Sequence, residues 1–376
     1  MELKHTPVEL AIVGGGAAGM FAASAAANRG LSTLLVERKA RLGSKVLMTA
    51  NGRCNFTKDL TPERFLADLD CGSDDSVRRF VTDAVRACPP RDVIAGFKSL
   101  GVPLRRMADG RMFPADGKAA TIVHAFGDLL RDNEIPLLTN CVVTGVRPQK
   151  NGFIVATRNF TLWAENVLLA TGGVSYPKTG SVGDGQNFAR QLGHRLVPYR
   201  SGLIGFETSD RRVTSLAGRR FEDGRARVIA PDGATACDCR GEVDCESFGL
   251  SGAAVYNAQR FIARTGMRDY TIEVRFGHER LAFRNLRPRP VKEAIVTLGG
   301  VSLDEIDPHT MESKIIPRLY FAGEVMDIDG PTGGYNLTLA FATARAAVEA
   351  IARSSRRPQR QRKCRQAERT EPVRRC

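Results

Sequence analysis

Apolar residues are spaced in two different ways along this chain. Up to about residue 193, continuous apolar runs alternate with segments in which apolar residues recur every three or four positions. The runs predict strands and the periodic segments predict helices. Expected strands are 10–13, 32–37, 140–146, 152–156, 160–164 and 166–170, and expected helices are 17–28, several within 61–100, 118–131 and 186–192. Such alternation is typical of an α/β fold.

Between residues 194 and 293 the spacing changes to short alternating segments, for example at 203–206, 226–229 and 271–276. This alternation predicts strands with one buried face. An apolar run at 294–302 and helical spacing from Leu337 to Ala352 then resume the first pattern. We therefore predict one α/β domain built from residues 1–193 and 294–352, with a β-rich substrate domain inserted at 194–293.

The first strand ends in a glycine-rich turn. Gly14, Gly16 and Gly19 have the G-x-G-x-x-G spacing, in which the first glycine allows the tight turn, the second lets a pyrophosphate approach the backbone, and the third lets helix and strand pack closely. The following helix offers free N–H groups to phosphates. Glu37 ends the second strand about 20 residues later, where it would accept a ribose hydroxyl. The glycines alone would fit any α/β turn, but the ordered set predicts a site for FAD or NAD rather than NADP.

A second glycine-rich turn, Ala170-Thr171-Gly172-Gly173, follows the apolar strand at 166–170. Backbone at such a turn can approach a cofactor, although an ordinary exit from a strand would look the same. Its position downstream of the first turn favours a Rossmann-like FAD-binding domain of the two-dinucleotide-binding type. No second G-x-G-x-x-G occurs later in the chain, which argues against a dedicated NAD(P)H domain.

Composition and charge narrow the class of protein. The chain has 376 residues, 43% hydrophobic and 26% charged, as is ordinary for a globular protein. No apolar run reaches about 18 residues, so we expect no membrane span. The polar residues 1–9 lead directly into the first strand and leave no room for a signal peptide, so we expect a cytoplasmic protein.

The net charge of +14 suggests nucleic acid as a partner, but its distribution weakens that suggestion. More than half of the excess lies in residues 353–376, which hold ten basic and two acidic residues and almost nothing apolar. We predict a disordered basic tail there. It would bind RNA only weakly, through phosphates, because it has no aromatic residue to stack on bases.

The nine cysteines are scattered, which fits a reducing compartment rather than a disulfide framework. Cys237, Cys239 and Cys245 form the only close group, and their spacing is not a usual zinc motif. We predict no metal site. The chain has no C-x-x-C, which argues against a flavin disulfide reductase.

Several longer motifs carry a family resemblance. They are Gly43-x-Lys45-x-Leu47 with Gly52-Arg53-Cys54-Asn55-x-Thr57, Gly110-Arg-x-Phe-Pro114, the loop 175–185, Phe248-Gly-Leu-Ser-Gly252 and the string from Gly323 to Asn336. Together they resemble the bacterial aminoacetone-oxidase-like flavoprotein family, also called BaiN-like or YhiN-like, over residues 8–352. Ala50-Asn51 stands where many members have Gly-Gly or Gly-Asn, and 253–290 is shorter than the family's usual helical segment.

The resemblance implies FAD as the cofactor and a set of residues that hold it. The glycine turns and the backbone at Val143 would contact the adenosine diphosphate part, and N–H groups at 334–336 would stabilise negative charge on the flavin N1/C2=O edge. The expected cofactor-binding residues are Gly14, Gly16, Ala18, Gly19, Glu37, Arg38, Lys45, Gly52, Arg53, Asn55, Val143, Ala170, Thr171, Gly172, Gly323, Glu324, Asp327, Gly334, Tyr335 and Asn336. Arg53, Lys178 and Tyr335 are the catalytic candidates near the ring.

We therefore predict an FAD-dependent oxidoreductase that transfers a hydride between flavin N5 and a small organic substrate or NAD(P)H. The resemblance implies either oxidation of an amine or aminoketone or reduction of an unsaturated substrate. NADH or NADPH would dock transiently. Two alternatives stay open: a non-catalytic or RNA-associated flavoprotein that uses the basic tail, suggested by the tail and the shortened insert, and an FAD-dependent RNA-modifying enzyme.

Overall fold

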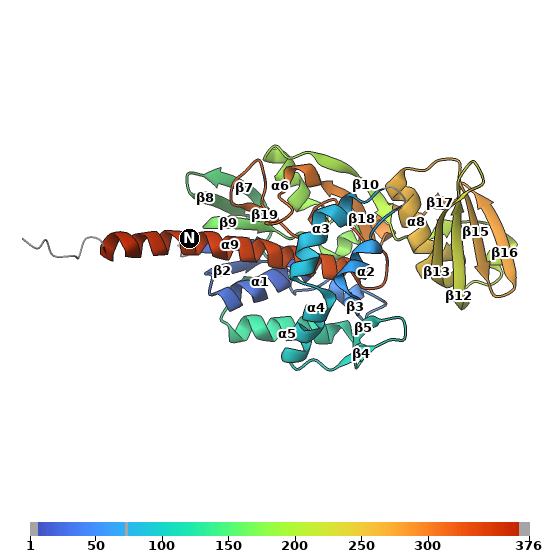
Figure 1. Ribbon diagram of the computed structural model, residues 1–376, viewed down its shortest axis with the longest axis horizontal. Coiled ribbons are helices and arrows are strands. Elements are labelled where there is room, and N and C mark those ends of the chain that lie inside the picture. The colour runs from blue at the N-terminus through green and yellow to red at the C-terminus, as the bar shows by residue number, and fades with distance from the viewer. Residues whose placement is uncertain (1–6, 72–73, 368–376) are drawn as a thin grey trace, which may run out of the picture.

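A mostly parallel sheet forms the centre of the molecule (Figure 1). The computed structural model describes residues 7–71 and 74–367, with 356–367 as backbone only. Five strands of the sheet run parallel, namely β6 (Leu137–Leu138), β2 (Thr33–Val36), β1 (Val8–Val13), β9 (Thr161–Leu169) and β19 (Leu319–Phe321). Most of their side chains are buried, and those of β2 and β19 are all buried, because both faces of the sheet are covered; this explains the continuous apolar runs.

One edge of β9 pairs with two different strands. Its first half pairs antiparallel with β8 (Gly152–Thr157), which in turn pairs with β7 (Val143–Gln149), and its second half pairs with β19. This places β19, which lies about 150 residues later in the sequence, beside the strands of the N-terminal part. The central sheet thus contains strands from both ends of the chain.

Helices α1 (Ala17–Arg29) and α9 (Tyr335–Ala367) pack side by side on the central sheet (Figure 1). Phe21 of α1 stacks on Phe341 of α9, with ring centroids 5.0 Å apart. Phe97 and Phe126 join this cluster from two further helices. The remaining helices of this domain are α2 (Pro62–Ala67), α3 (Ser76–Ala87), α4 (Pro90–Ser99), α5 (Ala119–Asp132) and α6 (Asp184–Gln191).

A small sheet and short 3-10 helices complete this part of the fold. The sheet consists of β3 (Thr57–Lys58), β5 (Arg111–Pro114) and β4 (Leu104–Arg106). The 3-10 helices are η1 (Val46–Met48), η2 (Pro177–Thr179), η3 (Val291–Glu293), η4 (Leu303–Glu305) and η5 (Gly323–Val325). Several of them lie in the loops that surround the central cavity described below.

A second hydrophobic core lies in a β-rich unit at the other end of the molecule (Figure 1). Its seven strands follow the order β16-β15-β12-β13-β14-β11-β17, and helix α8 (Ala253–Thr265) covers one face. The strands are β11 (Phe206–Glu207), β12 (Arg220–Ile229), β13 (Thr235–Glu246), β14 (Gly249–Ser251), β15 (Thr271–Phe276), β16 (Glu279–Arg284) and β17 (Arg287–Pro288), with the short helix α7 (Arg211–Thr214) between β11 and β12.

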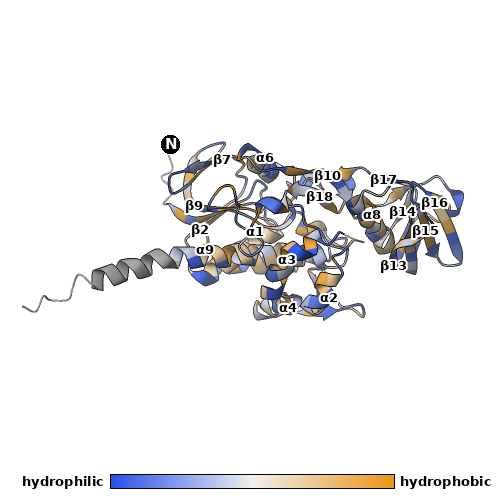
Figure 2. Ribbon diagram, turned by 45° about the horizontal axis from the view of Figure 1, so that its top comes forward, coloured by the Kyte–Doolittle hydropathy of each residue, from blue (hydrophilic) through white to orange (hydrophobic). Residues whose placement is uncertain are grey.

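The strands of this unit carry both hydrophilic and hydrophobic residues, in contrast to the apolar strands of the central sheet (Figure 2). Two connecting strands, β10 (Leu196–Gly202) and β18 (Val296–Val301), pair with each other rather than with either large sheet. The fold class predicted from the sequence is confirmed: a Rossmann-type α/β domain with a β-rich second unit.

The structure differs from the sequence prediction near the C-terminus. Helix α9 continues to Ala367, so residues 353–367 are helical where a disordered tail was expected, and residues 368–376 lie outside the described residues. Arginine, glutamine and lysine favour helix, and extending an existing helix avoids the cost of nucleation. None of the helices in the described ranges is long and apolar enough to cross a membrane.

Candidate functional site

Each of the three glycines in the first turn has a different geometric role. Gly14 has a φ of 109°, and a Cβ there would lie 2.5 Å from the carbonyl oxygen of Ala170 in the neighbouring strand. A Cβ at Gly19 would lie 1.8 Å from the Gly14 oxygen, so this glycine permits close packing of α1 on β1. A Cβ at Gly16 would meet no protein atom within 4 Å. The space above Gly16 therefore remains open to a ligand.

That space belongs to a cavity of about 640 Å³ that runs from the first turn to the β-rich unit. The β1–α1 turn and Ala170 to Gly172 line one end, the start of α9 lines the middle, and β13 with α8 lines the other end. Helix α1 has no side-chain cap, so its first N–H groups are available to an anion at the first end.

Glu37 lies at the end of β2, beside the glycine turn. One carboxylate oxygen accepts a hydrogen bond from the Gly15 N–H at 2.7 Å, and the other accepts from the Lys39 N–H at 2.7 Å. The side chain is buried but lines the cavity. Since a carboxylate has further lone pairs, it can also accept from a ribose hydroxyl.

Lys45 and Glu324 join the two ends of the chain inside the cavity. Their side chains form an ion pair at 2.6 Å, and Lys45 Nζ also donates to Ser175 Oγ at 2.7 Å. The second oxygen of Glu324 accepts from the Thr297 N–H at 2.6 Å. The sequence predicted both residues as cofactor ligands, and the structure brings them together at the centre of the cavity.

Two buried polar atoms beside the cavity fit a polar cofactor. Thr171 Oγ1 and Asn55 Oδ1 have no hydrogen-bond partner among the described residues. Burying such groups without a partner is costly, so a ligand that supplies hydrogen bonds would stabilise this arrangement. Together with the open space at Gly16 and the uncapped helix, these atoms match a long ligand with a pyrophosphate, a ribose and a polar ring, as FAD is.

Most of the predicted cofactor-binding residues line this cavity. They are Gly14, Gly16, Ala18, Glu37, Arg38, Lys45, Arg53, Asn55, Val143, Ala170, Thr171, Gly172, Gly323, Glu324, Gly334 and Asn336. Gly19, Gly52, Asp327, Tyr335 and Lys178 do not line it. Gly19 acts in packing, and the carboxylate of Asp327 pairs with Arg264 at 2.9 Å.

The three catalytic candidates have different surroundings. Tyr335 is buried, stacks on Phe65, and donates from its hydroxyl to Asp68 at 2.5 Å, so its side chain supports the start of α9. Lys178 is exposed in η2. Arg53 lines the cavity, and its guanidinium lies over the Phe113 ring, 5.6 Å from the centroid. Of the three, only Arg53 lines this cavity.

Residues at the β-rich end of the cavity were missed by the sequence analysis. Tyr256 and Asn257 lie on α8, and Arg240 and Glu242 lie on β13. Burial raises the pKa of Tyr256, and hydrogen bonds with Ser251 and Gly252 only partly oppose this. The available signal was the position of Tyr256 and Asn257 just after the Phe248–Gly252 string, in the first turn and a half of the following helix.

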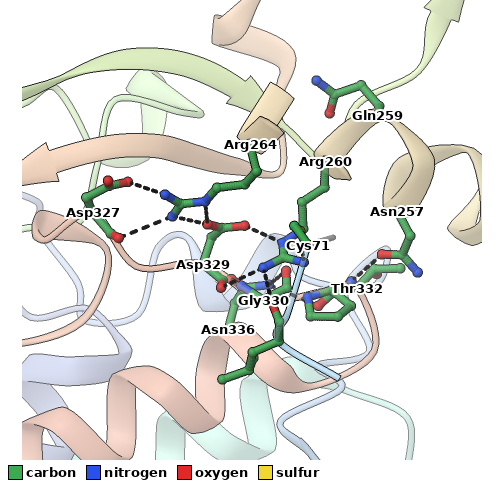
Figure 3. Close-up of polar contacts among 12 residues, drawn as sticks. Cys71, Asn257, Gln259, Arg260, Arg264, Asp327, Asp329, Gly330, Thr332 and Asn336 are labelled. Carbon is green, nitrogen blue, oxygen red and sulfur yellow. Dashed lines mark hydrogen bonds and ion pairs between the residues drawn. The ribbon is translucent and has the colours of Figure 1, made fainter. Parts of the chain in front are cut away.

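A buried ionic cluster connects α8 to the loop before α9 (Figure 3). Arg260 and Arg264 both form ion pairs with Asp329, whose side chain is fully buried. Arg260 also donates to the Leu69 carbonyl at 2.9 Å, and Asn257 accepts from the Thr332 N–H at 2.9 Å. Burial opposes ionisation of Asp329, but the two arginines outweigh it and lower the pKa of its carboxyl.

Comparison with known proteins places this geometry in a family. Residues 8–350 match the family described as HI0933-like protein Rossmann domain, which is nearly the whole chain. The chain belongs to the HI0933-like family. This confirms the family that the motifs indicated, since the HI0933-like family includes the BaiN-like and YhiN-like proteins.

Two relatives of the HI0933-like chain have different names. One is a 3-dehydro-bile acid delta(4,6)-reductase of Clostridium scindens, 27% identical, with 91% of this chain and 98% of that protein covered. The other is a ribosomal RNA dihydrouridine synthase of Escherichia coli, also 27% identical, with 90% and 96% covered. Both alignments therefore span nearly the full length of this chain and of the relative.

Solved structures with similar folds are flavoenzymes. Quinol fumarate reductase FrdA of E. coli superposes with a TM-score of 0.59 at 17% identity, covering 94% of this chain and 71% of that chain. A 3-ketosteroid delta1-dehydrogenase from Sterolibacterium denitrificans gives 0.58 at 12% identity, covering 93% and 100%. At these identities the likeness shows the fold alone. Family, fold and site agree that the chain is an enzyme, an FAD-dependent oxidoreductase.

Proposed function

We propose that this HI0933-like protein is a reductase that saturates a carbon–carbon double bond conjugated to a carbonyl group. The names of its two relatives support this, because a bile acid dienone and a uracil ring both present such a bond. The observation that carries the proposal is the single cavity joining the Gly16 turn to Tyr256 on α8. It puts a proton donor in the same space as the predicted cofactor site.

The cofactor would be held by groups already in place. The Gly16 backbone and the start of α1 would bind the pyrophosphate, Glu37 would bind the adenosine ribose, and Thr171 and Asn55 would gain their missing partners. When bound, FAD supplies hydride transfer at flavin N5, with NADH or NADPH as the source of the hydride.

Tyr256 would complete the reduction. Adding a hydride to one carbon of the double bond leaves negative charge on the enolate, and the second carbon must then take a proton. With its pKa raised by burial, the Tyr256 hydroxyl is protonated at neutral pH and donates that proton, which solvent then replaces. Arg53 and Asn257, which also line the cavity, would position the carbonyl group.

The experiment has two stages. Anaerobic NADH or NADPH added to the FAD-loaded protein should bleach its absorption near 450 nm, and an enone or a uridine oligonucleotide should restore it. Tyr256→Phe should leave the bleaching rate unchanged and slow the restoration by roughly 10²–10⁴-fold. Tyr199→Phe, at a tyrosine outside the cavity lining, is the matched control. The proposal fails if neither nucleotide bleaches the flavin absorption. It also fails if the substrate restores the absorption of Y256F as fast as that of the wild type.

We also infer a cytoplasmic location. The seven cysteines within the described ranges are all free thiols, which are usual in a reducing compartment and so support this location. Fractionation of the source cells tests this, and recovery in a secreted or periplasmic fraction would contradict it.

A further inference from the structure

Four arginines stand in register across four neighbouring strands of the β-rich sheet. Arg280 of β16 pairs with Arg275 of β15, Arg275 pairs with Arg225 of β12, and Arg225 pairs with Arg240 of β13. Paired residues of adjacent strands point to the same face, so these side chains form one line, which we call the arginine row. With strands about 4.8 Å apart, the row extends over about 14 Å.

The row lies on the sheet face opposite the hydrophobic core. Its neighbours Ala226, Val274 and Leu281, which point to the other face, are buried in the second core that α8 covers. Arg240, Arg275 and Arg280 are exposed and Arg225 is half-buried. The same face of β13 continues into the cavity, since Arg240 and Glu242 both line it. The row thus leads from solvent to the mouth of the site.

The charges of the row are only partly balanced. Arg225 forms an ion pair with Asp238, and Arg227, two residues further along β12 on the same face, forms one with Glu273. For Arg240, Arg275 and Arg280 the described residues provide no ion-pair partner within 4 Å. Like charges placed directly opposite each other destabilise a sheet, so this arrangement costs stability unless an anion covers it. Arg284, four residues further along β16 than Arg280, adds to the excess on this face.

We propose that the arginine row binds the phosphate backbone of a single-stranded RNA segment and directs one base into the cavity. This rests on the proposed function and names its substrate class, a uracil base within RNA. Guanidinium groups bind phosphate oxygens in pairs, and a row of this length spans several successive phosphates, whereas a small acid would need only one arginine. The arginine row is a different surface from the basic tail, for which the sequence predicted weak RNA contact, and it fits the open alternative of an RNA-modifying enzyme.

The test measures binding of a fluorescein-labelled 15-nucleotide oligouridine to the full-length, FAD-loaded protein by anisotropy at several salt concentrations. Arg275→Gln with Arg280→Gln should weaken binding roughly tenfold and flatten the slope of log affinity against log salt by about 1.4, or about 0.7 per lost phosphate contact. Arg147→Gln with Arg158→Gln, an equal charge change at exposed sites in β7 and after β8, should change neither quantity.

Three outcomes would contradict the proposal that the arginine row binds RNA. In the first, both double variants weaken oligouridine binding equally. In the second, R275Q/R280Q binds the oligouridine as the wild type does, which would assign RNA contact to the C-terminal helix or elsewhere. In the third, polyglutamate displaces the labelled oligouridine as well as unlabelled oligouridine does, which would show an unspecific basic face. Bleaching by NADH or NADPH is measured on the same samples. If the nucleotides bleach the flavin normally but RNA binding does not depend on the arginines, only the proposed RNA surface is refuted. If the flavin is not bleached but RNA binding is intact, only the proposed reductase function is refuted.

Discussion

At the scale of single residues, Gly16 and Gly19 are three positions apart but serve different purposes. Gly19 is in contact with the Gly14 backbone, where even a methyl group has no space. Gly16 faces the open cavity, where a methyl group would displace only ligand. The same type of residue therefore acts on folding at one position and on binding at the other.

This difference can be measured with two alanine variants. Gly16→Ala should change the free energy of unfolding of the apoprotein by less than about 1 kcal/mol but raise the dissociation constant of FAD at least tenfold, because the new methyl group occupies the pyrophosphate space. Gly19→Ala should destabilise the fold by about 3 kcal/mol or more, since the backbone must move. Thermal melts and flavin titration check both. If G16A binds FAD as well as the wild type does, the assigned pyrophosphate position is wrong.

Ala50 and Asn51 adopt backbone conformations that favour glycine. Both residues have positive φ, 49° and 54°, in the loop that lines the cavity. Alanine pays a steric cost of roughly 1–2 kcal/mol in this region, whereas asparagine tolerates it better. The loop is therefore held in place by its surroundings rather than by its own preference.

Ala50→Gly should relieve this strain and raise the free energy of unfolding by up to about 1 kcal/mol. Ala95→Gly provides the matched control, because Ala95 is exposed in the middle of α4 and the same change there should cost about 1 kcal/mol. Denaturant titrations compare the two. Destabilisation of similar size in both variants would contradict the left-handed conformation of Ala50.

At the scale of elements, the buried ionic cluster ties α8 to the segment that leads into α9 (Figure 3). That segment carries Gly334 and Asn336, which line the cavity, and its shape is also fixed by the Asn336 side chain, which donates to the Gly330 carbonyl at 3.0 Å. The β-rich unit and the predicted flavin end of the site are therefore mechanically connected.

Asp329→Asn should destabilise the protein by about 3–5 kcal/mol, since it leaves the buried Arg260 without a counter-ion and Arg264 with Asp327 alone. Asp304→Asn, which breaks an exposed ion pair with Arg195, should cost less than about 1 kcal/mol. The folded pKa of Asp329 is lowered, so its contribution is fully present above the unfolded value of about 3.9 and is lost as the pH falls through the folded pKa. The difference in the free energy of unfolding between wild type and D329N should thus stay constant from pH 7 to 5 and shrink below about pH 4. A difference that shrinks between pH 7 and 5 would contradict this.

At the scale of the whole molecule, the cavity collects residues from distant parts of the chain. Gly16, Lys45, Thr171, Glu324 and Asn336 all line it. A ligand that touches all of these regions binds only the folded arrangement. Binding should therefore stabilise the complete fold rather than one part of it.

FAD at 100 times its dissociation constant should stabilise the protein by about 2.7 kcal/mol and raise the melting temperature accordingly. ADP lacks the flavin part and would contact only the glycine-turn end of the cavity. At the same concentration it should give a smaller shift, because its affinity is lower. Differential scanning fluorimetry of the apoprotein measures both. Equal shifts with FAD and ADP would show that the flavin half of the site makes no productive contacts.

Much of the α/β domain could be predicted because its signals are local. The glycine turn, the apolar strands and the periodic helices each depend on residues within about 20 positions of one another. Most of the residues that the motifs predicted as cofactor-binding line the cavity, Glu37 and Asn55 among them. Tyr335 shows the limit of such signals: its place at the start of α9 could be predicted, but not that its ring turns toward Phe65 and Asp68 and away from the cavity.

By itself, the sequence determined the fold class, the cofactor and the family, because these depend on backbone conformations and periodicities that neighbouring residues impose. Only the tertiary structure decided which charged groups meet. Lys45 reaches Glu324 because β19 pairs with β9, and Arg260 reaches Asp329 because α8 packs against the loop before α9. The arginine row exists only through the register of four strands, and a shift of one residue in any strand would turn its arginine to the other face. Register is set by packing over the whole sheet, so no local pattern of residues contains it.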